Sequence, residues 1–345
     1  MRIYYNIGSV LTALISKQMA ELGIGRVRPP DGRGTGRVPF CGCARMNAVP
    51  GKRVDSAMLC LARGREVQAH MNRLAVFDLD RTLLDDTSSI SEGLVRRLAA
   101  ALVPGLCCTV ASGRDLERIV PFLEQLGWKS VPVIAEQGTV VVEPGNGHIL
   151  LERGISREVL LDTVDTVRSA RIPLNVILYG RDAPQVFRSA GAPSFVEGWL
   201  LGRYSHGLRD VPPLEQIITT GVRKVTVTCR PEDTEGIRAM LAAELGPRAT
   251  VVRADVNFVN IMDAGVDKGA ALRWLISYLG LEAASVMAVG DCEADQSMFA
   301  VAGVSVAVAN ADEPTRAMAR YVVPSNNDQG AALALESFAD GRFGL

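Results

Sequence analysis

Uninterrupted apolar runs alternate with amphipathic stretches from Met71 onward. Residues 74–77 form an apolar run without a polar gap, which is typical of a strand buried on both faces of a parallel sheet. Residues 90–102 then carry apolar side chains at helical spacing behind Ser91, a residue type that caps helices. Further strands are expected at 106–111, 131–135, 285–289 and 304–309, and further helices at 115–126, 268–279 and 313–319. This alternation predicts an α/β fold with a doubly wound, Rossmann-like parallel sheet.

The pattern changes between residues 156 and 263. A hairpin expected at 139–152 leads into this stretch, which mixes two amphipathic helices with β-rich runs. Strand–helix alternation resumes at 264. We therefore expect a core domain made of residues 71–155 and 264–345, with residues 156–263 inserted as a separate α+β unit.

Residues 1–70 do not share this pattern. Residues 26–51 are rich in Gly, Pro and Arg without clear periodicity, so we expect a disordered extension. Cys41, Cys43, Cys60 and His70 lack the spacing of the common zinc knuckles, so a zinc site is disfavoured. The basic, acid-poor composition leaves a transit peptide open, but we favour an extension without a fold of its own.

Composition narrows the class of protein. The 345 residues are 48% hydrophobic and 22% charged with a net charge of −1, so nothing calls for a nucleic-acid or anionic-membrane partner. Seven cysteines is an odd number, and Cys107 and Cys108 sit in an apolar run, which favours reduced core residues of a cytoplasmic protein. No apolar stretch reaches about eighteen residues, so we expect no transmembrane helix and no membrane partner.

Two carboxylates follow directly on the first apolar strand. The two-residue spacing of Asp78 and Asp80 projects both side chains to the same side where the strand ends. In an open α/β sheet, ligands bind beyond the carboxyl ends of the strands. Converging carboxylates at that edge favour a divalent cation, and oxygen ligands favour Mg²⁺. The alternative is that both residues simply end the strand and cap the next turn.

Other polar residues are expected at the same sheet edge. Ser112 and the backbone N–H groups of Gly113 and Arg114 are expected to open a helix, which makes a ready site for an anion. Lys268 near a helix start supplies a point charge for a phosphate oxygen or for an ionised nucleophile. Asp291 completes the metal carboxylates, and Asp295 one helical turn later can order metal-bound water or Lys268. Taken singly, such residues are more often helix caps or solvated side chains. Their occurrence together, each at or beside the end of a different strand, favours a site for phosphoryl transfer.

These residues resemble the four motifs of the haloacid dehalogenase (HAD) superfamily of phosphohydrolases. The resemblance covers nearly everything from Met71 to Leu345, and the insertion resembles the type IIB cap of Cof-like sugar phosphatases. The matching stretches are Asp-Leu-Asp-Arg-Thr at 78–82, Ser-Gly-Arg at 112–114, Asp-Lys-Gly at 267–269 and Gly-Asp-Cys-Glu-Ala-Asp at 290–295. The resemblance implies that Asp78 is a nucleophile forming an aspartyl-phosphate and that Asp80 acts first as acid and then as base. It also implies that Asp78, the carbonyl of Asp80, and Asp291 hold Mg²⁺.

Three positions depart from the usual pattern of that superfamily. Arg81 replaces the glycine most common after the second aspartate, and its side chain could point into solvent or narrow the entrance. Ala294 replaces a frequent asparagine. Glu-Gln-Gly at 136–138 stands where Asn-Gly is more usual, which leans toward mannosyl-3-phosphoglycerate or sucrose-phosphate phosphatases of the same cap type. None of these changes removes a catalytic group.

The resulting expectation is a Mg²⁺-dependent phosphatase for a small phosphorylated metabolite, in which the cap supplies specificity and excludes water. A phosphomutase on the same scaffold is one alternative. A non-catalytic sensor of phosphorylated metabolites is another, although binding alone needs no acid/base at Asp80. Candidate cap contacts, each equally readable as a solvated surface residue, are Arg181, Arg203, Tyr204 and His206.

Overall fold

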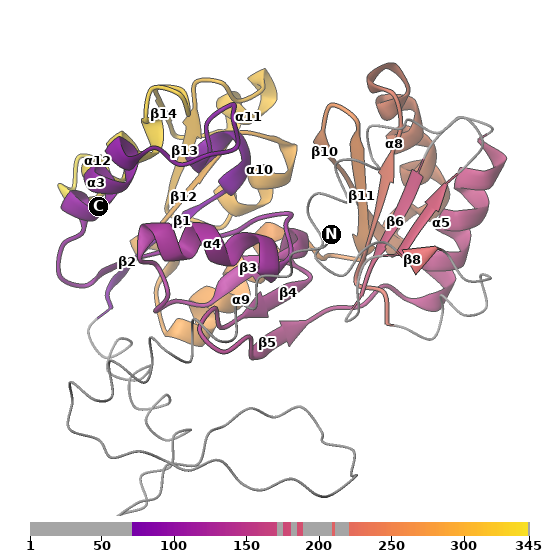
Figure 1. The fold of residues 1–345 in the computed structure, drawn as a ribbon, viewed down its shortest axis with the longest axis horizontal. Helices are drawn as coiled ribbons and strands as arrows, with labels where there is room; N and C mark the ends of the chain where they lie inside the picture. The colour runs from indigo at the N-terminus through magenta and orange to yellow at the C-terminus, as the bar shows by residue number, and fades with distance from the viewer. Residues whose placement is uncertain (1–70, 171–174, 181–184, 189–208, 211–220, 344–345) are drawn as a thin grey trace, which may run out of the picture. The chain divides into compact units, whose positions relative to one another are not determined.

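The computed structural model of the chain describes residues 71–170, 175–180, 185–188, 209–210 and 221–343 (Figure 1). The predictions for residues 1–70 and for the four candidate cap contacts therefore lie outside the described residues. The described part contains a parallel α/β core sheet, a smaller antiparallel sheet and an inserted α+β cap sheet.

The core sheet has five strands in the order β14-β13-β12-β1-β2, and every pairing in it is parallel. Its strands are β1 (Arg73–Phe77), β2 (Leu106–Val110), β12 (Val286–Gly290), β13 (Val304–Val308) and β14 (Tyr321–Val323). The helices of this region are α3 (Glu92–Ala101), α4 (Leu116–Leu126), α9 (Lys268–Leu279), α10 (Glu293–Phe299), α11 (Glu313–Met318) and α12 (Gly330–Ala339). The predicted parallel α/β fold is thus confirmed.

Strand β1 is buried on both faces because helices cover the sheet on either side. Ala75 and Phe77 pack into the apolar cluster that contains side chains of α3, α4 and α12. Leu74 and Val76 pack into the cluster formed with α9 and α10. The two-residue period of a strand sends alternate side chains to opposite faces, so a continuous apolar run is what this position requires.

Local sequence signals set the ends of two of these helices. The hydroxyl of Ser91 accepts a hydrogen bond from the N–H of Leu94 at 3.2 Å and caps α3. Gly127 ends α4 with a φ of +72°, the left-handed conformation that glycine adopts without steric cost.

The third predicted strand does not extend the core sheet. Strand β3 (Val133–Ala135) belongs to a separate sheet with β4 (Val140–Val142) and β5 (Ile149–Glu152), in the order β3-β4-β5. An isolated parallel bridge from Ala111 to Ile134 joins it to the chain beyond β2, and the N–H of Ser112 donates to the carbonyl of Ile134 at 2.9 Å. The hairpin that follows β3 supplies an antiparallel partner at once, so β3 pairs with β4 along its three residues.

The inserted cap consists of one sheet with helices α5 (Arg157–Ser169) and α8 (Pro231–Leu245) packed together on it. Its strand order is β10-β11-β9-β6-β7-β8, with one parallel pairing, between β7 and β8. The strands are β6 (Asn175–Tyr179), β7 (Gln185–Arg188), β8 (Arg209–Asp210), β9 (Lys224–Thr228), β10 (Ala249–Asp255) and β11 (Phe258–Asp263). Figure 1 shows both helices beside this sheet.

Strand β14 and helix α12 were not among the predicted elements. Helix α12 packs against α3, where Arg97 forms an ion pair with Glu336 at 2.9 Å. Within the described residues, no helix is long and apolar enough to span a membrane. Cys107 and Cys108 are both free thiols, as expected, and the second is buried.

Candidate active site

A buried lysine joins two carboxylates at the carboxyl end of the core sheet. The Nζ atom of Lys268 donates hydrogen bonds to Asp78 Oδ1 at 2.6 Å and to Asp295 Oδ1 at 2.7 Å. The three residues are 2%, 4% and 0% exposed, respectively. Buried charges of this kind need partners of opposite sign, and here one cation serves two anions.

The secondary structure places these groups directly. Asp78 follows β1, and its N–H donates to the carbonyl of Val289 in β12 at 2.9 Å, so the end of β1 lies beside the strand that leads to Asp291. Asp267 caps α9 through its side chain and thereby puts Lys268 at the first position of that helix. The predicted gathering of residues 78, 268, 291 and 295 at one sheet edge is therefore what the geometry shows.

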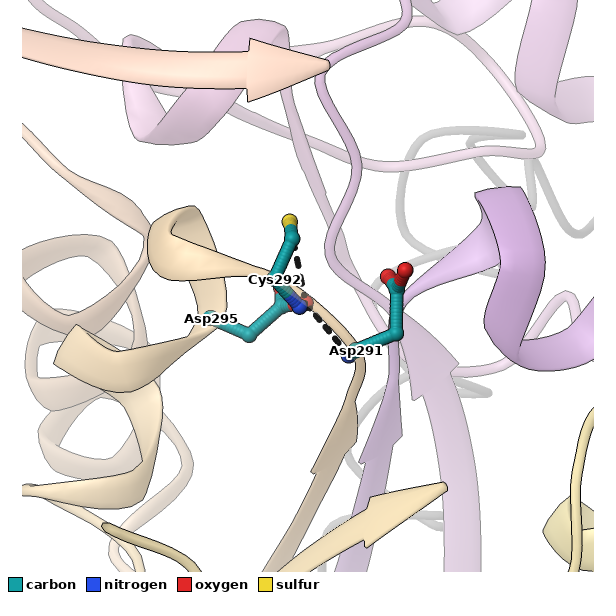
Figure 2. A group of neighbouring side chains, drawn as sticks. All are labelled: Asp291, Cys292 and Asp295. Carbon is teal, nitrogen blue, oxygen red and sulfur yellow. Dashed lines mark hydrogen bonds between the residues drawn. The ribbon is translucent and has the colours of Figure 1, made fainter. Parts of the chain in front are cut away.

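Asp295 organises the loop between β12 and α10. Its Oδ2 atom accepts hydrogen bonds from the N–H groups of Asp291 at 2.9 Å and Cys292 at 3.2 Å, while its Oδ1 atom accepts from Lys268. Figure 2 shows the Asp291 carboxylate directed away from the other two side chains. Although the ligand atoms of Asp291, Cys292 and Asp295 lie within 4.8 Å of one another, Asp295 is already occupied by these donors. Burial also raises the pKa of the Cys292 thiol, which makes it a poor metal ligand.

The buried carboxylates of this cluster outnumber its buried cation, and the pKa values of Asp78 and Asp291 are raised. Burial raises the pKa of Asp78 to about 7, and the nearby carboxylates of Asp295 and Asp80 add to this against the opposing effect of Lys268. Burial, followed by Asp295 and Asp78, raises the pKa of Asp291 to about 9. Burial acts to lower the pKa of Lys268, but the two carboxylates it contacts hold it well above its ordinary value.

This donor set fits Mg²⁺. Asp78 Oδ1 accepts the hydrogen bond of Lys268. Among the described residues, the contacts of the Asp291 carboxylate with Thr82 Oγ1 at 3.5 Å and with Arg81 Nε at 3.8 Å are long. Two buried carboxylates with raised pKa values and weakly engaged oxygens are the environment that a divalent cation stabilises. The residues present are thus chemically suited to the metal that the sequence predicts.

Asp80 lies apart from this cluster. Its side chain is 51% exposed and forms a two-pronged ion pair with Arg114, whose Nε donates to Oδ2 at 2.9 Å and whose Nη2 bonds to Oδ1. Burial acts to raise the pKa of Asp80, but the hydrogen bond and charge of Arg114 outweigh it and leave this pKa below its ordinary value. Asp80 is therefore held as a carboxylate in this conformation.

The segment Ser112–Arg114 precedes the helix instead of opening it. Helix α4 begins at Leu116 behind the Asp115 cap, and the Ser112 hydroxyl already accepts the N–H of Arg114 at 3.2 Å. The carbonyl of Gly113 accepts a hydrogen bond from Lys224 of the cap strand β9 at 2.6 Å. Ser112 is fully buried next to this contact. A cation from the cap thus lies against the predicted phosphate-binding segment.

Comparison with known proteins agrees with this geometry. The family model of the haloacid dehalogenase-like hydrolases matches residues 75–335. The chain belongs to this family of hydrolases.

Two curated relatives of this HAD hydrolase cover a similar share of it. The 5-amino-6-(5-phospho-D-ribitylamino)uracil phosphatase YwtE of Bacillus subtilis is 24% identical, over 77% of this chain and 98% of that protein. The chloroplastic endoribonuclease YBEY of Arabidopsis thaliana is 28% identical over 76% of this chain, but the chain spans only 46% of that protein's length. Among solved structures, the HAD subclass IIB sugar phosphatase BT4131 has the same fold, with a TM-score of 0.67 at 20% identity over 77% of this chain and 99% of that one.

Charged contacts between cap and core of this HAD hydrolase were not predicted from the sequence, and Arg223 makes two of them, with Glu136 and Glu152. Arg223 Nη2 donates to Glu136 Oε1 at 2.6 Å and to the carbonyl of Gly180 at 2.6 Å, and both charged side chains are buried. Its neighbour Lys224 makes the contact with Gly113 described above. The sequence does carry a signal for these contacts: Arg223 and Lys224 are adjacent cations at the start of an apolar strand. Charged residues at such buried positions usually have partners.

Proposed function

We propose that this hydrolase is a Mg²⁺-dependent phosphatase that acts on small phosphorylated metabolites, with sugar phosphates as the first substrate class to test. The observation that carries the proposal is the buried Lys268, which holds one oxygen of Asp78 and leaves the other for chemistry. Relatives support it as well, since YwtE is named a phosphatase and BT4131, a sugar phosphatase, has the same fold.

In the first step, an Asp78 carboxylate oxygen attacks the phosphorus of the substrate. The bond between phosphorus and the ester oxygen breaks, and an acyl phosphate forms on Asp78. Lys268 favours the ionised nucleophile, because its charge opposes the effect of burial on the pKa of Asp78. The leaving oxygen takes a proton from the Asp80 carboxyl group.

In the second step, water gives a proton to the Asp80 carboxylate and attacks the phosphorus, which releases inorganic phosphate and restores Asp78. Asp80 can serve as the initial acid only after it leaves Arg114, since that ion pair stabilises its unprotonated form. The half-exposed position of Asp80 leaves room for this rotation. Arg114 is then free to bind the phosphoryl oxygens, together with Lys268 and the Ser112–Gly113 segment.

The metal belongs to the same site. Asp78, the carbonyl of Asp80, and Asp291 are the groups that would hold Mg²⁺, which neutralises phosphoryl charge when bound. Asp295 keeps the Asp291 backbone in place through its hydrogen bond at 2.9 Å. The cap, residues 156–263 in this proposal, would select the substrate and exclude water.

The test is phosphate release from p-nitrophenyl phosphate and from a panel of sugar phosphates, with Mg²⁺ or with EDTA. Asp78→Asn should abolish release, while the matched exposed change Asp340→Asn should leave it unchanged. Circular dichroism confirms that both variants fold. Release from no substrate by folded, Mg²⁺-bound protein would refute the phosphatase. Transfer of phosphate between positions of one sugar would instead identify a mutase, and binding without turnover would identify a sensor.

A further inference from the structure

Arg81 adopts a backbone conformation that suits glycine. Its φ of +58° lies in the left-handed region, within the turn at Leu79–Leu83 that follows Asp78. A residue with a Cβ atom is strained there, and glycine is not.

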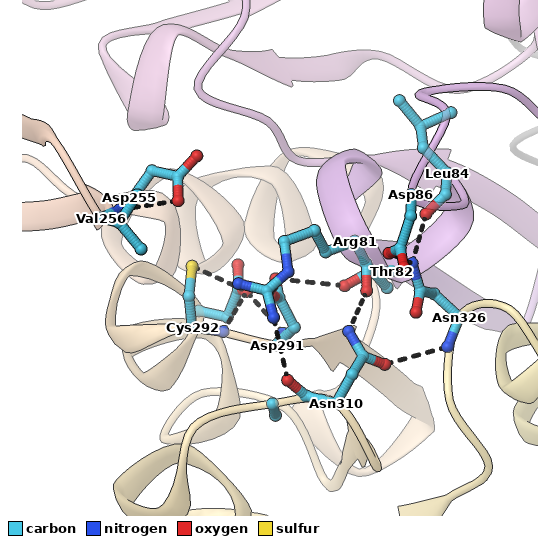
Figure 3. A network of polar contacts seen from close by, with 12 residues as sticks. Arg81, Thr82, Leu84, Asp86, Asp255, Val256, Asp291, Cys292, Asn310 and Asn326 are labelled. Atoms are coloured by element: carbon cyan, nitrogen blue, oxygen red, sulfur yellow. Dashed lines mark hydrogen bonds and ion pairs between the residues drawn. The ribbon is translucent and has the colours of Figure 1, made fainter.

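The guanidinium of Arg81 lies over the carboxylate predicted to bind metal. Its Nε atom is 3.8 Å from Asp291 Oδ2, and its Nη2 atom donates to the carbonyl of Asn310 at 3.2 Å. Asn310 returns a hydrogen bond from Nδ2 to the Arg81 carbonyl at 2.8 Å and accepts one from the N–H of Asn326 at 2.9 Å. Figure 3 shows this network beside Asp291. The arginine is thus held at the site from both its backbone and its side chain.

This contact gives Asp291 its nearest cation among the described contacts of that side chain. The Asp291 side chain is 4% exposed, while the Arg81 side chain is 51% exposed and faces water. The charge of Arg81 acts to lower the pKa of Asp291, against burial and the neighbouring carboxylates. A divalent cation that binds the same carboxylate gains less there, because it meets a positive charge nearby and because the ion pair has to loosen.

We propose that Arg81 is a built-in counter-cation of Asp291 that competes with Mg²⁺ and thereby sets the metal concentration at which the site loads. The inference rests on the proposed function, in which Asp291 is a metal ligand. Lys268 also acts to lower the pKa of Asp291, but less than Arg81 does, and its hydrogen bonds go to Asp78 and Asp295.

The expected size of the effect is moderate. Arg81 is half exposed, so water and salt screen its charge, and exposed charge pairs are worth little each. A doubly charged ion nevertheless feels twice the repulsion of a single charge. Removal of the guanidinium charge should therefore tighten Mg²⁺ binding by about threefold to tenfold at low ionic strength, with a smaller gain at high salt.

Three variants separate charge from backbone strain. Arg81→Gln removes the charge and keeps the Cβ atom, Arg81→Lys keeps the charge, and Arg81→Gly removes both the charge and the strain. Mg²⁺ alone is titrated into metal-free, full-length protein by isothermal titration calorimetry, without substrate, at 20 and 300 mM KCl. We expect Arg81→Gln and Arg81→Gly to bind Mg²⁺ more tightly than the parent protein and Arg81→Lys to bind it like the parent. The difference in affinity should shrink in high salt.

Equal or weaker Mg²⁺ binding by Arg81→Gln would overturn the inference. A gain in affinity in Arg81→Gly alone would overturn it too, because it would point to relief of backbone strain. The parent protein separates this failure from that of the proposed function. If the parent binds Mg²⁺ and Asp291→Asn does not, the metal site stands even where Arg81 has no effect. If the parent binds no Mg²⁺, both proposals fall.

Discussion

Stability of the metal-free protein should fall as the pH rises from 5 to 7.5. The perturbation is removal of Mg²⁺ with EDTA, and the groups concerned are Asp78 and Asp291, whose folded-state pKa values are raised to about 7 and about 9. A carboxylate with a raised pKa holds its proton in the folded state at pH values where the unfolded chain has already released it. The stabilising contribution is complete below the unfolded pKa and is lost as the pH rises through the folded pKa.

The magnitude follows from the shift. The pKa of Asp78 moves from 3.8 to about 7, and each unit corresponds to about 1.4 kcal/mol. Between pH 5 and 7.5, Asp78 alone should lower the free energy of unfolding by about 2–3 kcal/mol. Asp291 acts in the same direction, and so does the buried Glu136, whose pKa burial also raises. Burial lowers the pKa of Lys224 to about 8, and this group acts in the opposite direction only above that pH.

Urea unfolding followed by circular dichroism measures this dependence at pH 5, 6.5 and 7.5, in EDTA or in 10 mM Mg²⁺. In EDTA the free energy of unfolding should decrease with pH. In Mg²⁺ it should be higher at pH 7.5 and depend less on pH, because the metal stabilises the ionised carboxylates. Asp78→Asn should make the EDTA slope shallower, while the exposed control Asp340→Asn should not. A free energy of unfolding that stayed constant or rose with pH in EDTA would refute the reasoning. An Asp78→Asn protein with the same pH dependence in EDTA as the parent protein would refute it too.

Three further predictions concern single residues. Lys268→Met leaves two buried carboxylates without their cation, so it should abolish phosphate release and cost about 3–5 kcal/mol in urea unfolding; parental activity would contradict this. Gly138→Ala should cost about 1–3 kcal/mol in the same assay, because φ is +94° and a Cβ atom would lie 2.2 Å from a backbone carbonyl oxygen, whereas Gly145→Ala meets nothing within 4 Å and should cost much less. Arg114→Gln should raise the pKa of Asp80 and move the alkaline limb of the kcat/KM pH profile upward, and an unmoved limb would show that Asp80 is not the acid.

Local patterns were sufficient where the structure depends on neighbouring residues in the chain. The apolar run of β1 and the Ser91 cap could both be predicted, because strand period and helix capping are short-range properties. The four motifs were sufficient to expect Asp78, Lys268, Asp291 and Asp295 together, since parallel strands end at one edge of a sheet.

Pairings between distant segments came only from the tertiary structure. The apolar run that became β3 pairs with β4 over all three of its residues and meets the chain after β2 through one parallel bridge, an arrangement that its apolar pattern did not specify. The ion pair of Asp80 with Arg114 depends on how two loops meet, and the position of Arg81 over Asp291 depends on a turn that forces a positive φ. Sequence determines which side chains reach the sheet edge through local periodicity. Which charge faces which is decided by packing, because Coulomb interactions follow distance in space and not separation along the chain.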